Sequence, residues 1–351
     1  MKLSKKILLP FTLCVFINPV FADQESFKET EVKATQGNVK SQYNLGVMYW
    51  KGQDVAQSYI KAFEWFGKAA AQGDIDAQFN LGLMYSKGLS VTQNDAKALE
   101  WYIKAASQGH AEAQNVVGTK YVKGLGVTQS DIRAFEWFSK AAAQGDKDAQ
   151  NNLGNMYSDG QCITKDKVKA FEWYSKAAAQ GHVSAQYNLG VMYSNGQGTI
   201  KNDVKAAEWY SKAAAQGHVS AQNNLGVMYS KGLGVTQNDA KAFEWYSKAA
   251  AQGHAYAQNT LGGKYQKGLG VTQNDAKAFE WYSKAAAQGN ASAQNNLATM
   301  YVGGQGIVQN SALANEWLLK AANNGNAMAQ FNIGQNYLYG NNGLPKIVHK
   351  L

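Results

Sequence analysis

The chain has 351 residues, of which 45% are apolar and 17% are charged, and its formal net charge is +9. This composition excludes an intrinsically disordered protein, and no run of basic residues indicates nucleic-acid binding. Lys2, Lys5 and Lys6 supply three of the positive charges, so the rest of the chain is only mildly basic.

Residues 1–22 have the pattern of a secretory signal peptide. The basic segment MKLSKK precedes the largely apolar stretch ILLPFTLCVFINPVF, which is too short for a comfortable membrane span. Val20 and Ala22 place compact residues before a cleavage site, so the mature chain is expected to begin near Asp23 and to be periplasmic or secreted. An uncleaved anchor is the alternative. No later apolar run has membrane length, so no transmembrane segment is expected in the mature chain.

The chain without its leader retains one cysteine, Cys162, in a predicted loop. A single cysteine cannot form an internal disulfide. We interpret Cys162 as an incidental thiol, with an intermolecular link as the alternative.

The sequence repeats itself every 36 residues without an insertion. A period of this length indicates an array of stacked units rather than two or three globular domains. A glycine marks the period at Gly46, Gly82, Gly118, Gly154, Gly190, Gly226, Gly262 and Gly334, and Ala298 fills the missing place. Tryptophan keeps the same step at Trp65, Trp101, Trp137, Trp173, Trp209, Trp245, Trp281 and Trp317.

Each unit is predicted to contain two helices. In the second unit, apolar residues at helical spacing predict a first helix over about 76–87, which Gly88 ends. The second helix is expected to begin at an N-cap residue seven positions before each tryptophan. These residues are Ser58, Asn94, Ser130, Asp166, Asn202, Asn238, Asn274 and Asn310. The tryptophans recur beside constant alanines, which favours a packed core over a carbohydrate- or peptide-binding stripe.

The repeat positions also predict how the chain is organised. After the signal peptide, a capping helix occupies 23–37, eight repeats cover 38–325, a ninth first helix covers 326–340, and a tail covers 341–351. Lys28 and Glu29 replace the glutamate and tryptophan of the other units, which suits a helix that faces solvent at the end of an array.

The pattern AQxxLGxMYxxGxGVxxNxxKAxEWYxKAAxQG resembles the Sel-1-like repeat, a relative of the tetratricopeptide repeat, over about 38–340. Asp54, Ser90 and Cys162 depart from it, because they replace the second glycine of the GxG loop. The resemblance implies an all-α fold, a right-handed α/α solenoid, that acts as a noncatalytic adaptor for other proteins. In bacteria such proteins are often exported, so an envelope adaptor and a secreted host-interaction factor both remain open.

Positions that differ between units are candidates for binding a protein or peptide partner. Two such positions in each first helix lie four residues apart, on one face. The position that directly follows the first of them is an asparagine in most units, as in Asn44 after Tyr43, and we call this row of residues the asparagine ladder. Asparagine offers a donor and an acceptor for an extended peptide, although the regularity of the ladder favours the alternative that each asparagine bonds to a neighbouring helix or loop. By analogy with related solenoids this face is expected to be concave. The predicted contact residues are Tyr43, Asn44, Phe79, Asn80, Asn151, Asn152, Tyr187, Asn188, Asn223, Asn224, Asn295 and Asn296.

The second varied position carries Val47, Leu83, Thr119, Asn155, Val191, Val227, Gly263, Thr299 and Gln335. Lys120 and Lys264 stand where other units have the methionine of Met48, and are therefore exceptions worth testing.

No catalytic residue is predicted, although the sequence offers one alternative. Cysteine-rich Sel-1-like relatives are associated with β-lactamase or penicillin-binding activity, and Ser58 and Lys61 match S-x-x-K. The KTG and SDN partners and the paired cysteines are missing from the sequence, so a β-lactam hydrolase is the less favoured reading.

No metal or cofactor is expected either. Equivalent histidines in successive units are too far apart to share a zinc ion, so we expect them to start first helices. These are His110, His182, His218 and His254. No strand precedes the Gly-x-Gly loops, so nucleotide binding is not supported. The chain is expected to be a monomer.

Overall fold

The computed structural model describes residues 26–339. The predicted signal peptide, the first residues of the capping segment and the tail over 341–351 therefore lie outside the described residues. Within the described range the secondary structure consists of eighteen α-helices and no strand, which confirms the all-α fold class.

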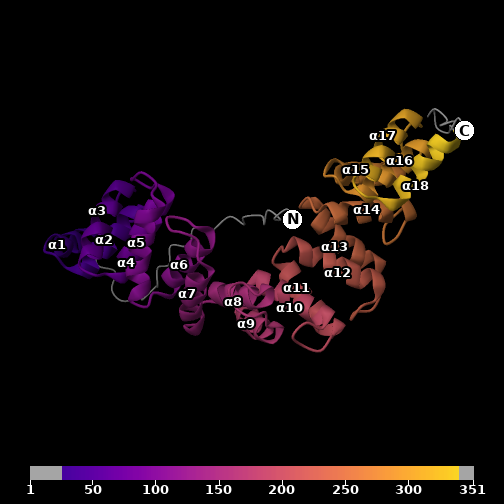
Figure 1. The fold of residues 1–351 in the computed structure, drawn as a ribbon. Helices are drawn as coiled ribbons and strands as arrows, with labels where there is room; N and C mark the ends of the chain where they lie inside the picture. Colours follow the sequence, from indigo (N-terminus) through magenta and orange to yellow (C-terminus); the bar gives the residue numbers. More distant parts are fainter. Residues whose placement is uncertain (1–25, 340–351) are drawn as a thin grey trace, which may run out of the picture. The chain divides into compact units, whose positions relative to one another are not determined.

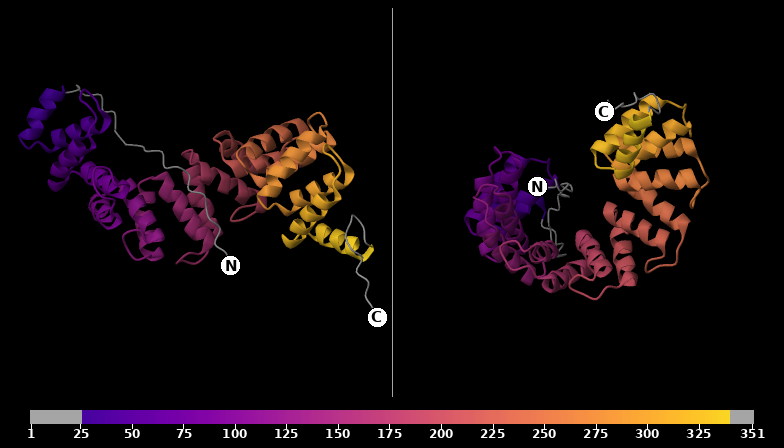
Figure 2. Two further views of the ribbon diagram at one scale, coloured as in Figure 1. Left: turned by 90° about the horizontal axis from the view of Figure 1, so that it is seen from above. Right: turned by 45° about the vertical axis from the view of Figure 1, so that its right-hand side comes forward.

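The chain divides into two compact units, Met1–His110 and Ala111–Leu351, and the division falls at a repeat boundary. The first unit contains α1 (Phe27–Thr35), α2 (Val39–Lys51), α3 (Tyr59–Ala71), α4 (Ile75–Lys87) and α5 (Asp95–Ser107) (Figure 1). The second contains α6 (Ala111–Lys123), α7 (Asp131–Ala143), α8 (Lys147–Asp159), α9 (Lys167–Ala179), α10 (Val183–Asn195), α11 (Asp203–Ala215), α12 (Val219–Lys231), α13 (Asp239–Ala251), α14 (Ala255–Lys267), α15 (Asp275–Ala287), α16 (Ala291–Gly303), α17 (Ser311–Asn323) and α18 (Ala327–Tyr339). Figure 2 shows the helices of each unit from two further directions.

The predicted helix ends are confirmed. At the start of α13, Asn238 Oδ1 accepts a hydrogen bond from the backbone N–H of Lys241 at 2.9 Å, and the other seven predicted N-cap residues do the same for their own helices. The first helix α4 runs to Lys87, and Gly88 follows with φ of 67°, a left-handed conformation that glycine adopts without steric cost.

Within a unit, a second helix packs against the first helix of its own repeat and, where the unit contains it, against the first helix of the next repeat. Thus α3 lies against α2 and α4, and α7 lies against α6 and α8. Alanines lie where these helices meet: Ala134, Ala141 and Ala149 are fully buried. Small side chains let the helices approach, and one aromatic ring per repeat fills the remaining space.

The glycine that marks the period lies directly under this ring. A Cβ atom on Gly118 would stand 2.7 Å from the Phe138 ring, and one on Gly154 would stand 2.5 Å from the Tyr174 ring. One repeat has Ala298 in place of this glycine. The same explanation applies there, because Ala298 faces Leu318, a leucine in place of the aromatic ring. Glycine is required where an aromatic ring occupies the volume of a side chain.

The structure corrects the interpretation of the tryptophans. Trp137 and Trp245 are half-buried, whereas the residues that follow them, Phe138 and Tyr246, are each 3% exposed. A lysine three positions later covers the outer side of each indole: Lys140 Nζ lies 4.3 Å from the ring centroid of Trp137. The tryptophans border the core, and the next residue fills it.

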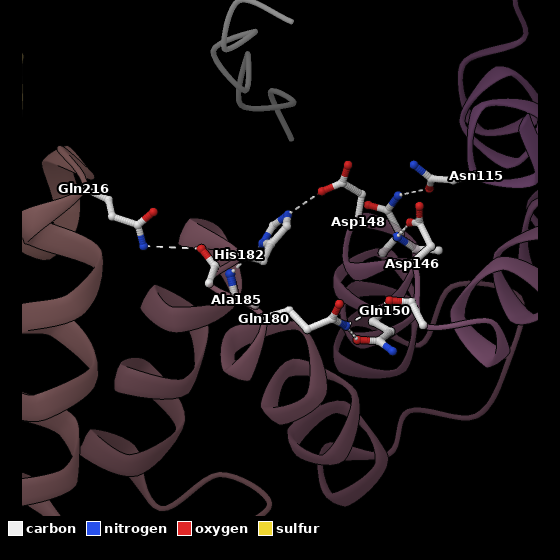
Figure 3. A network of polar contacts seen from close by, with 12 residues as sticks. Asn115, Asp146, Asp148, Gln150, Gln180, His182, Ala185 and Gln216 are labelled. Carbon is white, nitrogen blue, oxygen red and sulfur yellow. Dashed lines mark hydrogen bonds and ion pairs between the residues drawn. The ribbon is translucent and has the colours of Figure 1, made fainter. Parts of the chain in front are cut away.

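A glutamine network, which the sequence analysis missed, joins neighbouring repeats. Gln150 in α8 is buried and donates from Nε2 to the backbone oxygen of Ala142 at 3.3 Å. Gln180, at the end of α9, donates from Nε2 to Gln150 Oε1 at 2.9 Å (Figure 3). The same glutamine-to-glutamine bond recurs with Gln216 and Gln252 as donors. Its only sequence signal was the constancy of the Ala-Gln and Gln-Gly pairs.

In four of the GxG loops the second glycine approaches the preceding second helix closely, at Gly198, Gly234, Gly270 and Gly306. A Cβ atom on Gly234 (φ of 66°) would stand 2.1 Å from the backbone oxygen of Asp203. The three departures from glycine keep the left-handed backbone, with φ of 58° at Asp54, 60° at Ser90 and 55° at Cys162. These residues therefore carry a conformational cost that glycine does not.

The described part of the predicted N-terminal cap is the helix α1. Glu29, in the tryptophan position, is exposed, and Thr30, in the position of the core ring, is 2% exposed. The ninth first helix is observed as α18.

Candidate functional site

A groove opens on the first-helix side between α10, α11 and α12. It has a volume of about 340 Å³. Tyr187 and Val191 of α10, Tyr210 of α11, and Asn224 and Val227 of α12 line it, together with neighbouring residues. Both varied positions and the asparagine ladder therefore meet in one place.

A second groove, of about 240 Å³, lies between α16, α17 and α18. It occupies the equivalent place three repeats later. Its lining includes Thr299, Val302, Leu318, Asn332 and Gln335, which correspond to Val191, Ser194, Tyr210, Asn224 and Val227 of the first groove. The groove thus occurs at two equivalent places of the second unit, and its lining differs between them.

Not every predicted contact residue is open to a partner. Phe79, Asn80, Asn151 and Asn223 are each only 8% exposed. Neighbouring helices cover them: the Phe79 ring, for example, lies 5.4 Å from the ring of Tyr102 in α5, the second helix of the same repeat. These four side chains therefore do not form an open surface. The remaining predicted contact residues are partly exposed.

The asparagine ladder bonds to the varied position of the preceding repeat. Asn152 Nδ2 donates to Asn115 Oδ1 at 3.0 Å, and Asn296 Nδ2 donates to Asn259 Oδ1 at 3.0 Å. The structure thus gives two ladder residues, Asn152 and Asn296, the role of linking repeats, one of the two roles expected from the sequence.

Within residues 26–339, three buried amide oxygens at the varied position have no hydrogen-bond partner. They are Oδ1 of Asn151, Asn223 and Asn295, all of them buried atoms. A buried carbonyl without a donor is costly, by roughly 1–3 kcal/mol. These repeats therefore have a hydrogen-bond acceptor that their own neighbours leave unused.

The histidines begin first helices, as expected. His218 Nδ1 accepts a hydrogen bond from the backbone N–H of Ala221 at 3.2 Å, and its ring stacks on Tyr187 with 4.4 Å between centroids. Burial lowers the pKa of His218 and that of His254. In another repeat, His182 Nε2 lies 3.3 Å from Asp148 Oδ1, and this hydrogen bond lowers the pKa of Asp148 (Figure 3).

Acidification is expected to destabilise the fold through His218 and His254. Their lowered pKa values mean that the unfolded chain binds protons below about pH 6.5 more readily than the folded chain does. Their contribution is therefore complete above that pH and falls as the pH decreases. Protonation of Nδ1 would also remove the helix-capping acceptor and place a cation at a helix N-terminus.

Denaturant titrations at about pH 7.5 and about pH 5.5, on either side of the ordinary histidine pKa, measure this effect. The matched control is the double substitution His218→Asn and His254→Asn, because Asn290 caps α16 at the same position. The double variant should lose less stability on acidification than the wild type. An equal loss would contradict the assignment.

Lys264 has a structural role. It is 4% exposed, and its Nζ lies 2.8 Å from Asp239 Oδ1. Lys264→Met introduces the residue that the equivalent Met228 already supplies. We expect an unfolding free energy within about 1 kcal/mol of the wild type, or above it, because an apolar replacement avoids the desolvation of a buried charge. A loss above that, measured by denaturant titration, would show that the ion pair is required.

The S-x-x-K residues also have structural roles. Ser58 Oγ accepts a hydrogen bond from the backbone N–H of Lys61, and Lys61 Nζ lies 3.4 Å from Tyr49 Oη. Within residues 26–339, no cluster of three or more histidine, cysteine or acidic side chains is placed to hold a metal ion. No helix of this range is long and apolar enough to cross a membrane.

The paired helices and their grooves define an α-helical repeat protein of the tetratricopeptide-like class. The Sel1 repeat model matches residues 39–74, 75–110, 111–146, 147–182, 183–218, 219–254, 255–290, 291–326 and 327–349. The chain therefore belongs to the Sel1 repeat family, whose members generally act as scaffolds for protein interactions and are typically noncatalytic.

Two solved structures are similar over most of the chain. One is c5321, described as a protective antigen present in uropathogenic Escherichia coli strains and displaying an SLR fold. It is 39% identical, with a TM-score of 0.85, over 90% of this chain and 68% of that one. The other is a Sel1 repeat protein from Oxalobacter formigenes, 33% identical with a TM-score of 0.65, over 89% of this chain and 90% of that one. A comparison with curated proteins finds no match.

Proposed function

We propose that this protein is a noncatalytic scaffold that is exported to the bacterial envelope and binds a protein or peptide along its first-helix grooves. The observation that carries the proposal is the recurrence of the groove at equivalent positions with different linings. A purely structural groove would need no such variation. Two related but non-identical grooves, three repeats apart, suit an extended partner that places a different side chain in each.

The chemistry of the groove favours a peptide over a charged ligand. The α10–α12 groove combines two tyrosines and an asparagine with valines, and no charged side chain lines it. Aromatic and aliphatic walls accept apolar side chains, and the amides and hydroxyls can bond to a peptide backbone. The unpaired oxygens of Asn151 and Asn223 supply further acceptors if a bound partner reorients these amides.

Two observations bear on where the scaffold works. The leader-like residues 1–22 support export. The similarity to a protein described as a protective antigen supports an alternative role, a secreted or surface-exposed factor that contacts a host. Both versions use the same grooves and differ in the origin of the partner.

Site-specific photo-crosslinking tests the proposal. A photoreactive residue replaces Val191 or Val227 in the groove, or Glu244 on the exposed side of α13 as the matched control. The variants are expressed in the source bacterium, with and without host cells, and crosslinked proteins are identified by mass spectrometry. A protein crosslinked through the two groove positions and not through Glu244 supports the proposal, and its origin separates the two versions. Equal crosslinking from all three positions would contradict it.

A further inference from the structure

The helix α18, the first helix of the ninth repeat, exposes a face that is covered in the other repeats. Phe331 is 62% exposed, whereas Phe79, its equivalent in α4, is 8% exposed. Leu338 and Tyr339 are 50% and 61% exposed. No helix follows α18 within residues 26–339, so the described chain provides no second helix for this face.

The chain itself shows what fits such a face. α18 carries Ala-Gln-Phe-Asn-Ile-Gly over 329–334, and α4 carries Ala-Gln-Phe-Asn-Leu-Gly over 77–82. On α4, this surface holds the second helix α5. The two surfaces differ by one aliphatic residue in this segment, so α4 with α5 bound is a template for the occupied state of α18.

Three contacts define how α5 is held. The Tyr102 ring lies over Gly82, where a Cβ atom would stand 2.7 Å from it, and 5.4 Å from the Phe79 ring. Gln108 Nε2 donates to Gln78 Oε1 at 2.8 Å. Ala98 is fully buried. The recognised pattern is thus an alanine, an aromatic residue four positions after it and a glutamine ten positions after the same alanine.

The equivalent places on α18 are open. The space where a Cβ atom of Gly334 would lie has no neighbour within 4 Å, although seven equivalent glycines have an aromatic ring there. Gln330, the equivalent of Gln78, is exposed, while its Nε2 still donates to the backbone oxygen of Ala322. Thus α18 provides both the space beside Gly334 for an aromatic ring and the side-chain oxygen of Gln330 as the acceptor for a glutamine.

The geometry points to α18 as a docking site for one amphipathic helix of a partner protein, which bears the Ala-x-x-x-Tyr/Phe pattern with a glutamine after its last turn. This helix continues the stacking of the array. A second copy of this chain is the less suitable occupant, because its terminal helix α1 has Thr30 in place of the ring and the exposed Glu29 beside it. This surface is separate from the α10–α12 groove.

A labelled synthetic peptide of residues 94–109, which spans α5 and its ends, is the probe. Its binding to the full chain is followed by fluorescence anisotropy. We expect saturable binding with one peptide per chain, and a peptide carrying Tyr102→Ala should bind at least about tenfold more weakly, because it lacks the anchoring ring.

The decisive variant is Gly334→Ala. The added methyl group meets nothing in the free chain and favours the helix, but it occupies the seat of the ring, so peptide binding should fall at least about tenfold. Gly67→Ala is the matched control, because Gly67 also lies in a helix with open space around it. Phe331→Ala, a change at an exposed side chain, should also weaken binding.

Absence of saturable binding would overturn the inference, as would binding that Gly334→Ala leaves unchanged, since the peptide would then occupy another place. Sedimentation of the chain without peptide tests the remaining occupant. Self-association that Gly334→Ala abolishes would assign the face to a second copy and overturn the partner-helix assignment.

Discussion

Replacing Phe138 by alanine is expected to lower the unfolding free energy by about 3–5 kcal/mol, whereas Trp137→Ala should cost roughly half as much. Phe138 is 3% exposed and fills the space between α6 and α7, so its removal leaves a cavity. Trp137 is half-buried and partly covered by Lys140, so solvent can occupy much of the space that it leaves. Chemical denaturation followed by circular dichroism gives both values. The reverse order would mean that the tryptophan is the core residue.

A double-mutant cycle isolates the contact between the ring and the glycine. Gly118→Ala alone places a methyl group 2.7 Å from the Phe138 ring and should cost about 1–3 kcal/mol through overpacking. Adding Phe138→Leu reproduces the Ala298 and Leu318 pair that the chain already contains. The double variant should therefore be more stable than the sum of the two single losses predicts. Simple additivity would exclude the proposed complementarity.

The second large effect is expected at a loop glycine. Gly234→Ala forces a side chain into a left-handed backbone and brings its Cβ to 2.1 Å from the backbone oxygen of Asp203. The backbone conformation costs about 1–2 kcal/mol, and relief of the clash about 1–3 kcal/mol more. Denaturant titration should thus show a loss of about 2–5 kcal/mol.

Cys162 provides the reverse experiment, because it occupies the same loop position with φ of 55°. Cys162→Gly should raise the unfolding free energy by up to about 1 kcal/mol, since the strained conformation is relieved while the unfolded chain gains some freedom. If Cys162→Gly destabilises the protein, the thiol makes a contact that outweighs the backbone strain.

Local chemistry explains which expectations from the sequence were confirmed. Helix starts, such as Asn238, depend on one side chain and one backbone N–H three residues away. Helix ends, such as Gly88, depend on a single backbone conformation. The fixed period implies that the same local structure recurs in each unit. The helix ends and the fold class could therefore be predicted without coordinates.

The candidate site was predicted in part. Tyr187, Val191 and Val227 were selected because their positions vary between repeats, Asn224 was selected as part of the asparagine ladder, and the structure brings all four into one groove. Variation between repeats also selected Asn223, which is 8% exposed. Such variation shows that a position tolerates different residues. It does not show whether a neighbouring helix covers that position.

The sequence by itself determined the helical repeats, their period, their caps and the family. The tertiary structure decided which aromatic residue fills the core, that Gln180 bonds to Gln150 between the two helices of one repeat, and that Phe331 is uncovered where Phe79 is buried. The physical reason is that capping depends on neighbours within about one helical turn. Burial and pairing depend on side chains about 30 residues away, which meet only when the helices pack against one another.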